Sequence, residues 1–123
     1  MENIRAEELG FELMHLGINN PDAVAGKATA EILCDLFGFA CRETEGSYFV
    51  GKDEFEVMKK PFLGRLGHFA IGTTDLPKAM EYLEGKGIAF DESTAVRGED
   101  GKIRVIYFAQ DIAGFRIHLT QKS

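Results

Sequence analysis

Apolar positions along the chain switch between two spacings, and they do so twice in the same order. Segments in which every second residue is apolar predict strands, and apolar residues three and four positions apart predict helices. Residues 14–22 and 67–75 match each other: each has a histidine in second place, then three apolar or small residues, then small polar residues and an aspartate. A helical pattern follows each match, so the chain is predicted to contain two similar modules.

The first predicted helix begins near Asn20, which is an N-cap residue type, and has Pro21 in its first turn. Gly38 is its expected C-cap. We expect its apolar stripe to pack on the sheet; the stripe consists of Val24, Ala28, Ile32, Leu33, Leu36 and Phe37.

The second predicted helix begins at Thr74 or Asp75, has Pro77 in its first turn and ends at Gly85 or Gly87. Predicted strands occupy residues 14–18, 40–44, 47–51, 54–59, 68–72, 89–95, 103–109 and 115–121. Each module is therefore predicted to be βαβββ, with module one at about 13–60, module two at about 66–121, and residues 1–12 as an amphipathic lead-in. No linker separates the modules, so residues 1–123 are expected to form a single domain of the α+β class.

Composition narrows the classes of function. The chain has 123 residues, of which 45% are hydrophobic and 28% charged, as in a folded globular protein. Its net charge of −6 disfavours a nucleic-acid partner. No apolar run is long enough to span a bilayer and no signal peptide opens the chain, so we expect a cytoplasmic protein with no membrane partner. Cys34 and Cys41 are then expected to be free thiols that behave as small buried hydrophobes.

All three histidines fall at strand positions that share one predicted face. Because side chains alternate along a strand, His15 is opposite in direction to Met14, Leu16 and Ile18. The same alternation places His68, His118 and Glu56 on the face turned away from the helices. Three imidazoles and one carboxylate suit a divalent ion of zinc, nickel, cobalt, manganese or iron. No thiolate joins them, which argues against a closed structural zinc site.

The paired modules and these four positions resemble the vicinal oxygen chelate superfamily, which includes glyoxalases, bleomycin resistance proteins, extradiol dioxygenases and methylmalonyl-CoA epimerase. The resemblance runs from about Leu13 to Thr120 and implies a cupped, mixed eight-stranded sheet. Family ligands lie on the first and last strand of each module, and the matching residues are His15, Glu56, His68 and His118. The resemblance also implies a homodimer. An extradiol dioxygenase is disfavoured, because those enzymes generally carry four modules.

One position departs from the family pattern. The last-strand ligand is usually a glutamate, which in glyoxalase-type members also moves a proton, whereas this chain has His118. A metal-bound imidazole is a poorer general base, because its lone pair is committed to the metal. The segment around His118 also resembles domains that follow keto-deoxy-phosphogluconate type aldolases, which implies a small oxo acid or sugar acid as ligand. Other candidate bases are Tyr48, Tyr107 and Glu43.

Three residues are candidates for substrate binding. Arg116 and Thr120 share the predicted face of His118, and Arg104 lies on the neighbouring predicted strand. Arginine binds carboxylates and phosphates with paired hydrogen bonds, but a salt bridge within the protein is the alternative role of either arginine.

The sequence is compatible with three functions. The first is a metal-dependent lyase or isomerase that acts beside a carbonyl of a small substrate chelated through two adjacent oxygens. The second is a non-catalytic module that binds or sequesters such a molecule, as resistance proteins do, or assists an aldolase. The third is a metal-free domain in which the histidines form hydrogen bonds.

Overall fold

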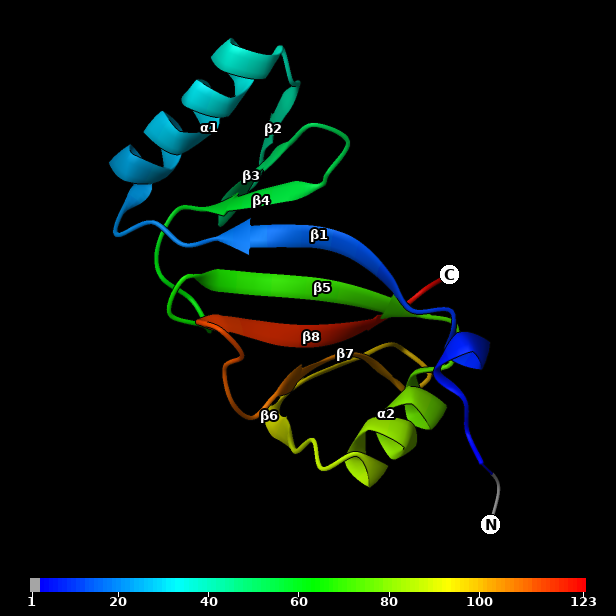
Figure 1. The fold of residues 1–123 in the computed structure, drawn as a ribbon. Coiled ribbons are helices and arrows are strands. Elements are labelled where there is room, and N and C mark those ends of the chain that lie inside the picture. Colours follow the sequence, from blue (N-terminus) through cyan, green and yellow to red (C-terminus); the bar gives the residue numbers. More distant parts are fainter. Residues whose placement is uncertain (1–2) are drawn as a thin grey trace.

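The two modules join edge to edge in one mixed eight-stranded sheet, in the order β2-β3-β4-β1-β5-β8-β7-β6 (Figure 1). The computed structural model describes residues 3–123. Residues 1–2 of the predicted lead-in lie outside the described residues. In chain order the elements are η1 (Ala6–Leu9), β1 (Glu12–Ile18), α1 (Ala23–Phe37), β2 (Cys41–Glu43), β3 (Ser47–Val50), β4 (Phe55–Met58), β5 (Gly67–Thr73), α2 (Leu76–Gly85), β6 (Phe90–Arg97), β7 (Ile103–Phe108) and β8 (Phe115–Gln121).

The pairing is the same in both modules. The first strand pairs in parallel with the last, β1 with β4 and β5 with β8, and an antiparallel β1–β5 ladder connects the modules at the centre of the sheet. This arrangement confirms the predicted α+β class and the two βαβββ modules. The ends of the first and last strands of both modules are consequently neighbours, although they are far apart in the sequence.

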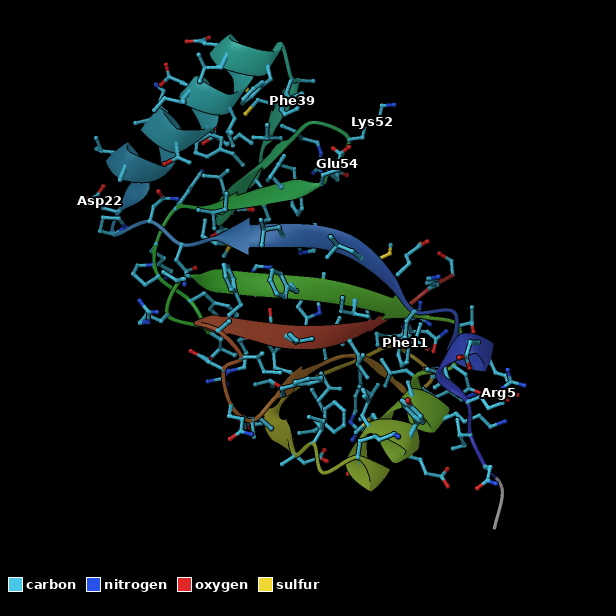
Figure 2. The ribbon with its side chains drawn as sticks, viewed as in Figure 1. Arg5, Phe11, Asp22, Phe39, Lys52 and Glu54 are labelled. Carbon is cyan, nitrogen blue, oxygen red and sulfur yellow. The ribbon has the colours of Figure 1, made fainter. Side chains whose placement is uncertain are left out.

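Both helices cover the same face of the sheet, which we call the helix face. Helix α1 packs over Val50 and Val57 through Ala30, and α2 packs over Ile106 and Leu119. The lead-in adds to the hydrophobic core beneath α2. Leu9 of η1 is fully buried in this core, and Phe11 packs against it (Figure 2). The opposite face carries the imidazoles, and we call it the imidazole face.

Helix α1 begins later than predicted. Its N-cap is Asp22, whose carboxylate accepts a hydrogen bond from the Ala25 backbone N–H (Figure 2). Asn20 instead ties the turn before α1 to β4, because its amide donates to the Met58 carbonyl and accepts from the Thr29 hydroxyl. The predicted C-cap is confirmed, because Gly38 adopts the left-handed conformation at φ 69° and its N–H donates to a carbonyl in the last turn.

The predicted apolar stripe of α1 is largely wrong. Gly26 and Ala30 face the sheet, and a Cβ at position 26 would press on the Met58 carbonyl oxygen, so small residues let the helix approach β4 closely. Val24 is 81% exposed and Leu36 70% exposed. The exposed apolar residues of this helix are Val24, Ile32, Leu36 and Phe37. The helix is apolar on two sides, and periodicity does not distinguish them.

A bulge in β1 changes one predicted side-chain direction. The β1–β5 register shifts between Leu13 and His15. A Cβ at Gly72, which shares the face of His68, would meet the sulfur of Met14. Met14 therefore lies on the imidazole face with His15 and not on the opposite face, as the strict alternation predicted.

The cysteines and the helices bear on the environment expected for the chain. Cys34 and Cys41 are free thiols, but Cys41 is exposed at the start of β2, so its predicted burial is wrong. In residues 3–123, no helix has the length and hydropathy required to cross a membrane.

Candidate metal centre

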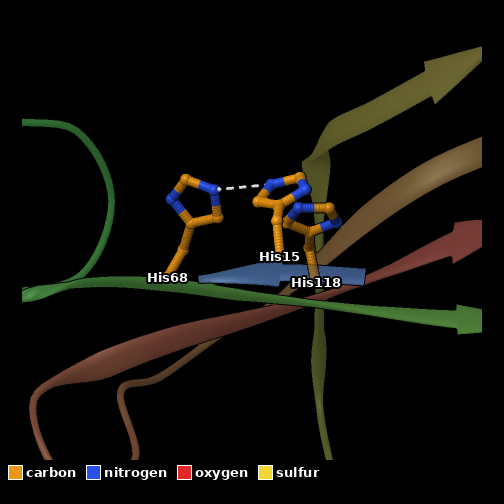
Figure 3. A group of neighbouring side chains, drawn as sticks. All are labelled: His15, His68 and His118. Atoms are coloured by element: carbon orange, nitrogen blue, oxygen red, sulfur yellow. Dashed lines mark hydrogen bonds between the residues drawn. The ribbon is translucent and has the colours of Figure 1, made fainter. Parts of the chain in front are cut away.

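Three of the four predicted ligands meet directly on the imidazole face. The Nε2 atoms of His15 and His68 lie 3.1 Å apart. The dashed line in Figure 3 marks this hydrogen bond. The Oε1 atom of Glu56 is 3.1 Å from Nε2 of His68 and 3.4 Å from Nε2 of His15. Two imidazoles and a carboxylate thus converge from β1, β5 and β4.

His118 completes the group from β8. One ring nitrogen from each of His15, His68 and His118 lies within 4.8 Å of the other two. The ring centroid of His118 is 5.5 Å from that of His68 and 5.7 Å from that of His15. His68 and His118 are buried, whereas the His15 side chain keeps 20% of its surface exposed. The cluster therefore opens toward solvent on the His15 side.

Equivalent register in the two modules explains the convergence. Glu56 of β4 is beside Gly17, which follows His15 by two residues. His118 of β8 is beside Ala70, which follows His68 by two residues. In the central ladder, His15 faces Ala70 and His68 faces Gly17. Each imidazole therefore lies across from a small residue, which leaves room for the rings to approach one another.

The donor set fits a divalent ion. Two ligand atoms that are each about 2.1 Å from one ion and at right angles to each other are about 3.0 Å apart. The separations among Nε2 of His15, Nε2 of His68 and Oε1 of Glu56 run from 3.1 to 3.4 Å. Nδ1 of His68 is buried without a hydrogen-bond partner, so protein contacts alone leave this ring unsatisfied.

Hydroxyl groups orient the Glu56 carboxylate. The Ser47 hydroxyl donates to Oε2 of Glu56 at 2.9 Å and lies 3.0 Å from the Thr44 hydroxyl. Burial alone would raise the pKa of Glu56, but hydrogen bonds from His15, His68 and Ser47 hold it well below its usual range. The carboxylate is ionised at neutral pH and keeps Oε1 directed at the imidazoles.

His118 is oriented in a similar way. Its Nδ1 is 3.1 Å from the Thr120 hydroxyl, which leaves Nε2 as the atom available to the cluster. Burial and the nearby His68 lower the pKa of His118 to about 4. The ring is therefore neutral at pH 7, which is the state that binds metal ions. Thr120, predicted as a substrate-binding residue, lies on the imidazole face and contacts His118 through its hydroxyl.

Aromatic side chains flank the cluster on both sides. Phe49 of β3 meets His15 edge-on at 5.8 Å between ring centroids. Tyr107 of β7 pairs with His118 in the ladder, and its ring lies 4.7 Å from that of His118. Burial and the charge of Glu56 raise the pKa of Tyr107 to about 12, so Tyr107 is a hydrogen-bond donor and a poor base at neutral pH.

The other two candidate bases lie on the wrong face. Tyr48 packs against the α1 cluster on the helix face. Glu43 pairs with Tyr48 in the ladder and forms an ion pair with Lys59 at 2.7 Å. Hydrogen bonding to Lys59 lowers the pKa of Glu43. Neither group is positioned to take a proton from a molecule bound at the imidazoles.

The two candidate arginines lie outside the cluster. Arg116 neighbours His68 in the β5–β8 ladder, but its guanidinium donates to Asp111 at 2.7 Å and to the Phe108 carbonyl at 3.3 Å. Arg104 is exposed and lines a cavity of about 470 Å³ at the start of α2. That cavity is lined by Thr74, Asp75, Pro77, Asp100, Lys102, Ile103, Arg104, Gln121, Lys122 and Ser123. None of these residues is a predicted metal ligand.

The sequence analysis did not identify the hydroxyl groups of Ser47 and Thr44 that orient Glu56. Ser47 is predicted to begin a strand, and alternation from the buried Val50 places it on the imidazole face beside Met58. The signal was therefore available for Ser47. Its link to Glu56 depends on the β3–β4 register, which the sequence does not encode locally.

No protein-family model matches the chain, and no curated protein matches it either. Solved structures do match. Methylmalonyl-CoA epimerase from Mycobacterium tuberculosis is 18% identical with a TM-score of 0.65, over 98% of this chain and 93% of that chain. A hypothetical protein from Bacillus halodurans is 17% identical with a TM-score of 0.61, over 93% of this chain and 96% of that chain.

Ligand-bound structures are among the matches. A methylmalonyl-CoA epimerase in complex with methylmalonyl-CoA and NH4+ is 19% identical with a TM-score of 0.59, over 90% of this chain and 94% of that chain. At such identities the likeness establishes the fold. The chain shares the glyoxalase-like fold of these structural neighbours, a mixed eight-stranded sheet with two helices.

Proposed function

We propose that the protein is a divalent-metal-dependent enzyme of the glyoxalase-like type, which acts on a small substrate chelated through two neighbouring oxygens. Two overlapping groups on the imidazole face carry the proposal. Ring nitrogens of His15, His68 and His118 lie within 4.8 Å of one another. Oε1 of Glu56 lies 3.4 Å from Nε2 of His15 and 3.1 Å from Nε2 of His68. Zinc, nickel, cobalt, manganese and iron all accept imidazole and carboxylate ligands. A small oxo acid is the substrate class that the resemblance favours.

The chain's own residues would divide the work. The three histidines and Glu56 would hold the ion, Ser47 and Thr120 would fix the orientation of Glu56 and His118, and Tyr107 would face the bound molecule. When bound, a divalent ion supplies a Lewis acid that stabilises negative charge on a substrate oxygen. Of lyase and isomerase chemistry, the isomerase type is supported by the epimerase names of the structural neighbours.

Metal content tests the proposal. Purified protein incubated with each candidate ion and desalted should retain about one ion per chain by elemental analysis, and His68→Ala should lower that content sharply because it removes a ligand. Glu56→Gln should weaken binding, whereas Glu43→Gln, the same change on the helix face, should not. A wild-type chain that retains no ion under any condition would favour the metal-free alternative.

A second candidate function is a non-catalytic binding module. It is favoured by the positions of the candidate bases: Tyr48 and Glu43 lie on the helix face, and Tyr107 holds its proton. Deuterium exchange at the carbon beside the carbonyl, followed by NMR with pyruvate and methylmalonyl-CoA, distinguishes the two functions. Exchange by the metal-loaded wild type supports an enzyme. Exchange that appears only in His118→Glu supports a binding module that lacks a base.

The resemblance also leads us to propose a homodimer. Its support is the apolar side of α1, where Val24, Ile32 and Leu36 are exposed. Light scattering coupled to size-exclusion chromatography should give twice the chain mass, and Leu36→Glu should reduce it to one chain mass if this helix forms the contact. A wild-type protein that runs as one chain mass at high concentration contradicts the proposal.

A further inference from the structure

The rim of the imidazole cluster on the module-two side is formed by two aromatic residues from distant segments. Tyr107 lies on β7 next to His118, and its ring centroid is 6.4 Å from that of His68. Phe62, in the connection between the modules, meets Tyr107 edge-on at 5.8 Å. These two side chains therefore stand side by side next to His118, on the module-two side of the cluster.

The hydroxyl of Tyr107 is the polar atom on this rim. The backbone of Tyr107 is held in place, because the residue pairs with His118 in the β7–β8 ladder and its N–H donates to the Thr94 hydroxyl at 2.9 Å. The Tyr107 ring centroid lies 4.7 Å from that of His118 and 6.4 Å from that of His68. A tyrosine hydroxyl beside a ligand cluster is a directional donor with a large apolar ring attached.

The backbone holds Phe62 in place while its ring stays exposed. The side-chain amide of Asn19 donates to the carbonyls of Phe62 and Gly64 at 3.3 and 2.7 Å, and its oxygen accepts from the Phe62 N–H at 3.3 Å. The Phe62 side chain is nevertheless 51% exposed. A large apolar side chain held on an ordered connection and left half-exposed is suited to contact a ligand.

The charges of the donor set restrict the ligand further. Imidazoles bind metal ions in their neutral form. A complex of a divalent ion with three imidazoles and one carboxylate would therefore carry one net positive charge. The nearby guanidinium of Arg116 is already paired with Asp111. The site is therefore complementary to a ligand with one negative charge, and the rim contributes apolar surface with a single hydroxyl donor.

We propose that Tyr107 and Phe62 determine ligand specificity: the Tyr107 hydroxyl donates to an oxygen of the chelated ligand, and the Phe62 ring contacts its apolar side chain. The preferred ligand is then a monoanionic α-keto acid with a bulky apolar side chain. The inference rests on the proposed function, because it requires an ion at the imidazole cluster.

Calorimetric titration of the metal-loaded protein tests this inference with two probes of equal charge, pyruvate and α-ketoisocaproate. The wild type should bind α-ketoisocaproate about tenfold more tightly. Phe62→Ala should abolish that preference and leave the affinity for pyruvate unchanged. Tyr107→Phe should lower the affinity for both probes about fivefold, because one hydrogen bond to the ligand is lost.

Matched controls are available on the helix face and on α1. Tyr48→Phe removes the same hydroxyl from β3 on the helix face, and Phe37→Ala removes an exposed phenylalanine from the end of α1; both should bind as the wild type does. Metal content is measured on every variant first. No retained ion in the wild type overturns the proposed function itself. A retained ion with no preference between probes, or with affinities that both rim variants leave unchanged, overturns this inference alone.

Discussion

Gly17 and His68 face each other across the β1–β5 ladder, and the His68 imidazole occupies the space that a side chain at position 17 would fill. A Cβ at Gly17 would overlap Cε1 and Nδ1 of the ring. The absence of a side chain on β1 is therefore what allows a fully buried imidazole from β5 to lie flat against the strand and point Nε2 at His15 and Glu56.

Gly17→Ala is expected to disrupt the metal centre through His68. Since the strand backbone on either side is paired, the ring must move, and its Nε2 loses its place beside Glu56. We expect metal affinity to fall by a factor of about 10–100 and the melting temperature of the metal-free protein to fall as well. Isothermal titration and thermal unfolding measure the two effects. Gly46→Ala is the control, because a Cβ there meets open space; equal behaviour of the two variants would contradict the role of Gly17.

Ser47→Ala is expected to weaken metal binding without touching a ligand. The change removes the donor to Oε2 of Glu56 and leaves the carboxylate free to rotate. Affinity should fall about tenfold, and the free energy of unfolding should fall by about 1 kcal/mol. Titration with zinc and urea unfolding are the measurements. Ser93→Ala, at an exposed serine bonded to Asp91, serves as the control. Unaltered zinc affinity in the Ser47 variant would show that Glu56 needs no orienting partner.

Strand alternation was sufficient to predict that the three imidazoles share one face of the sheet. His15, His68 and His118 each lie within a strand whose apolar partners identify the opposite face, and the two modules repeat the same spacing. The direction of a side chain relative to its neighbours is a local property, so it can be read from the sequence. The expectation that these side chains meet came from the resemblance, which places the family's ligands on the first and last strand of each module.

Features that depend on tertiary packing were not predicted correctly. The bulge at Met14 reverses one side chain, and it arises from the register between β1 and β5, not from the residues of β1 alone. Helix α1 presents Gly26 and Ala30 to the sheet because they allow close approach, although Ile32 and Leu36 are more hydrophobic. The face of Glu43 likewise follows from its pairing with Tyr48 in the β2–β3 register.

Thr120→Val is expected to remove the constraint on the orientation of the His118 ring. Valine keeps the shape of threonine but removes the hydroxyl that bonds Nδ1 of His118, so the ring can turn Nε2 away from the other imidazoles. Metal affinity should fall about tenfold. Thr120→Ser retains the hydroxyl and should restore most of the affinity, which separates loss of the hydrogen bond from loss of packing. Equal affinities for the valine and serine variants would argue against the orienting role of this hydroxyl.

The metal-free protein is expected to lose stability on mild acidification because of His118. Burial lowers the pKa of this imidazole to about 4, whereas an unfolded histidine titrates near its ordinary value of 6.5. The unfolded chain therefore takes up a proton at this site as the pH falls below about 6.5, while the folded chain does not, so folding becomes less favourable. Between pH 7 and pH 5 the loss should be roughly 2 kcal/mol. The lowered pKa of Glu56 acts at lower pH, because its contribution is fully present above the ordinary carboxyl range. Urea unfolding in the presence of a chelator at both pH values measures this change in the free energy of unfolding. His118→Gln should show a smaller change than the wild type. The same change in both proteins would mean that another group is responsible.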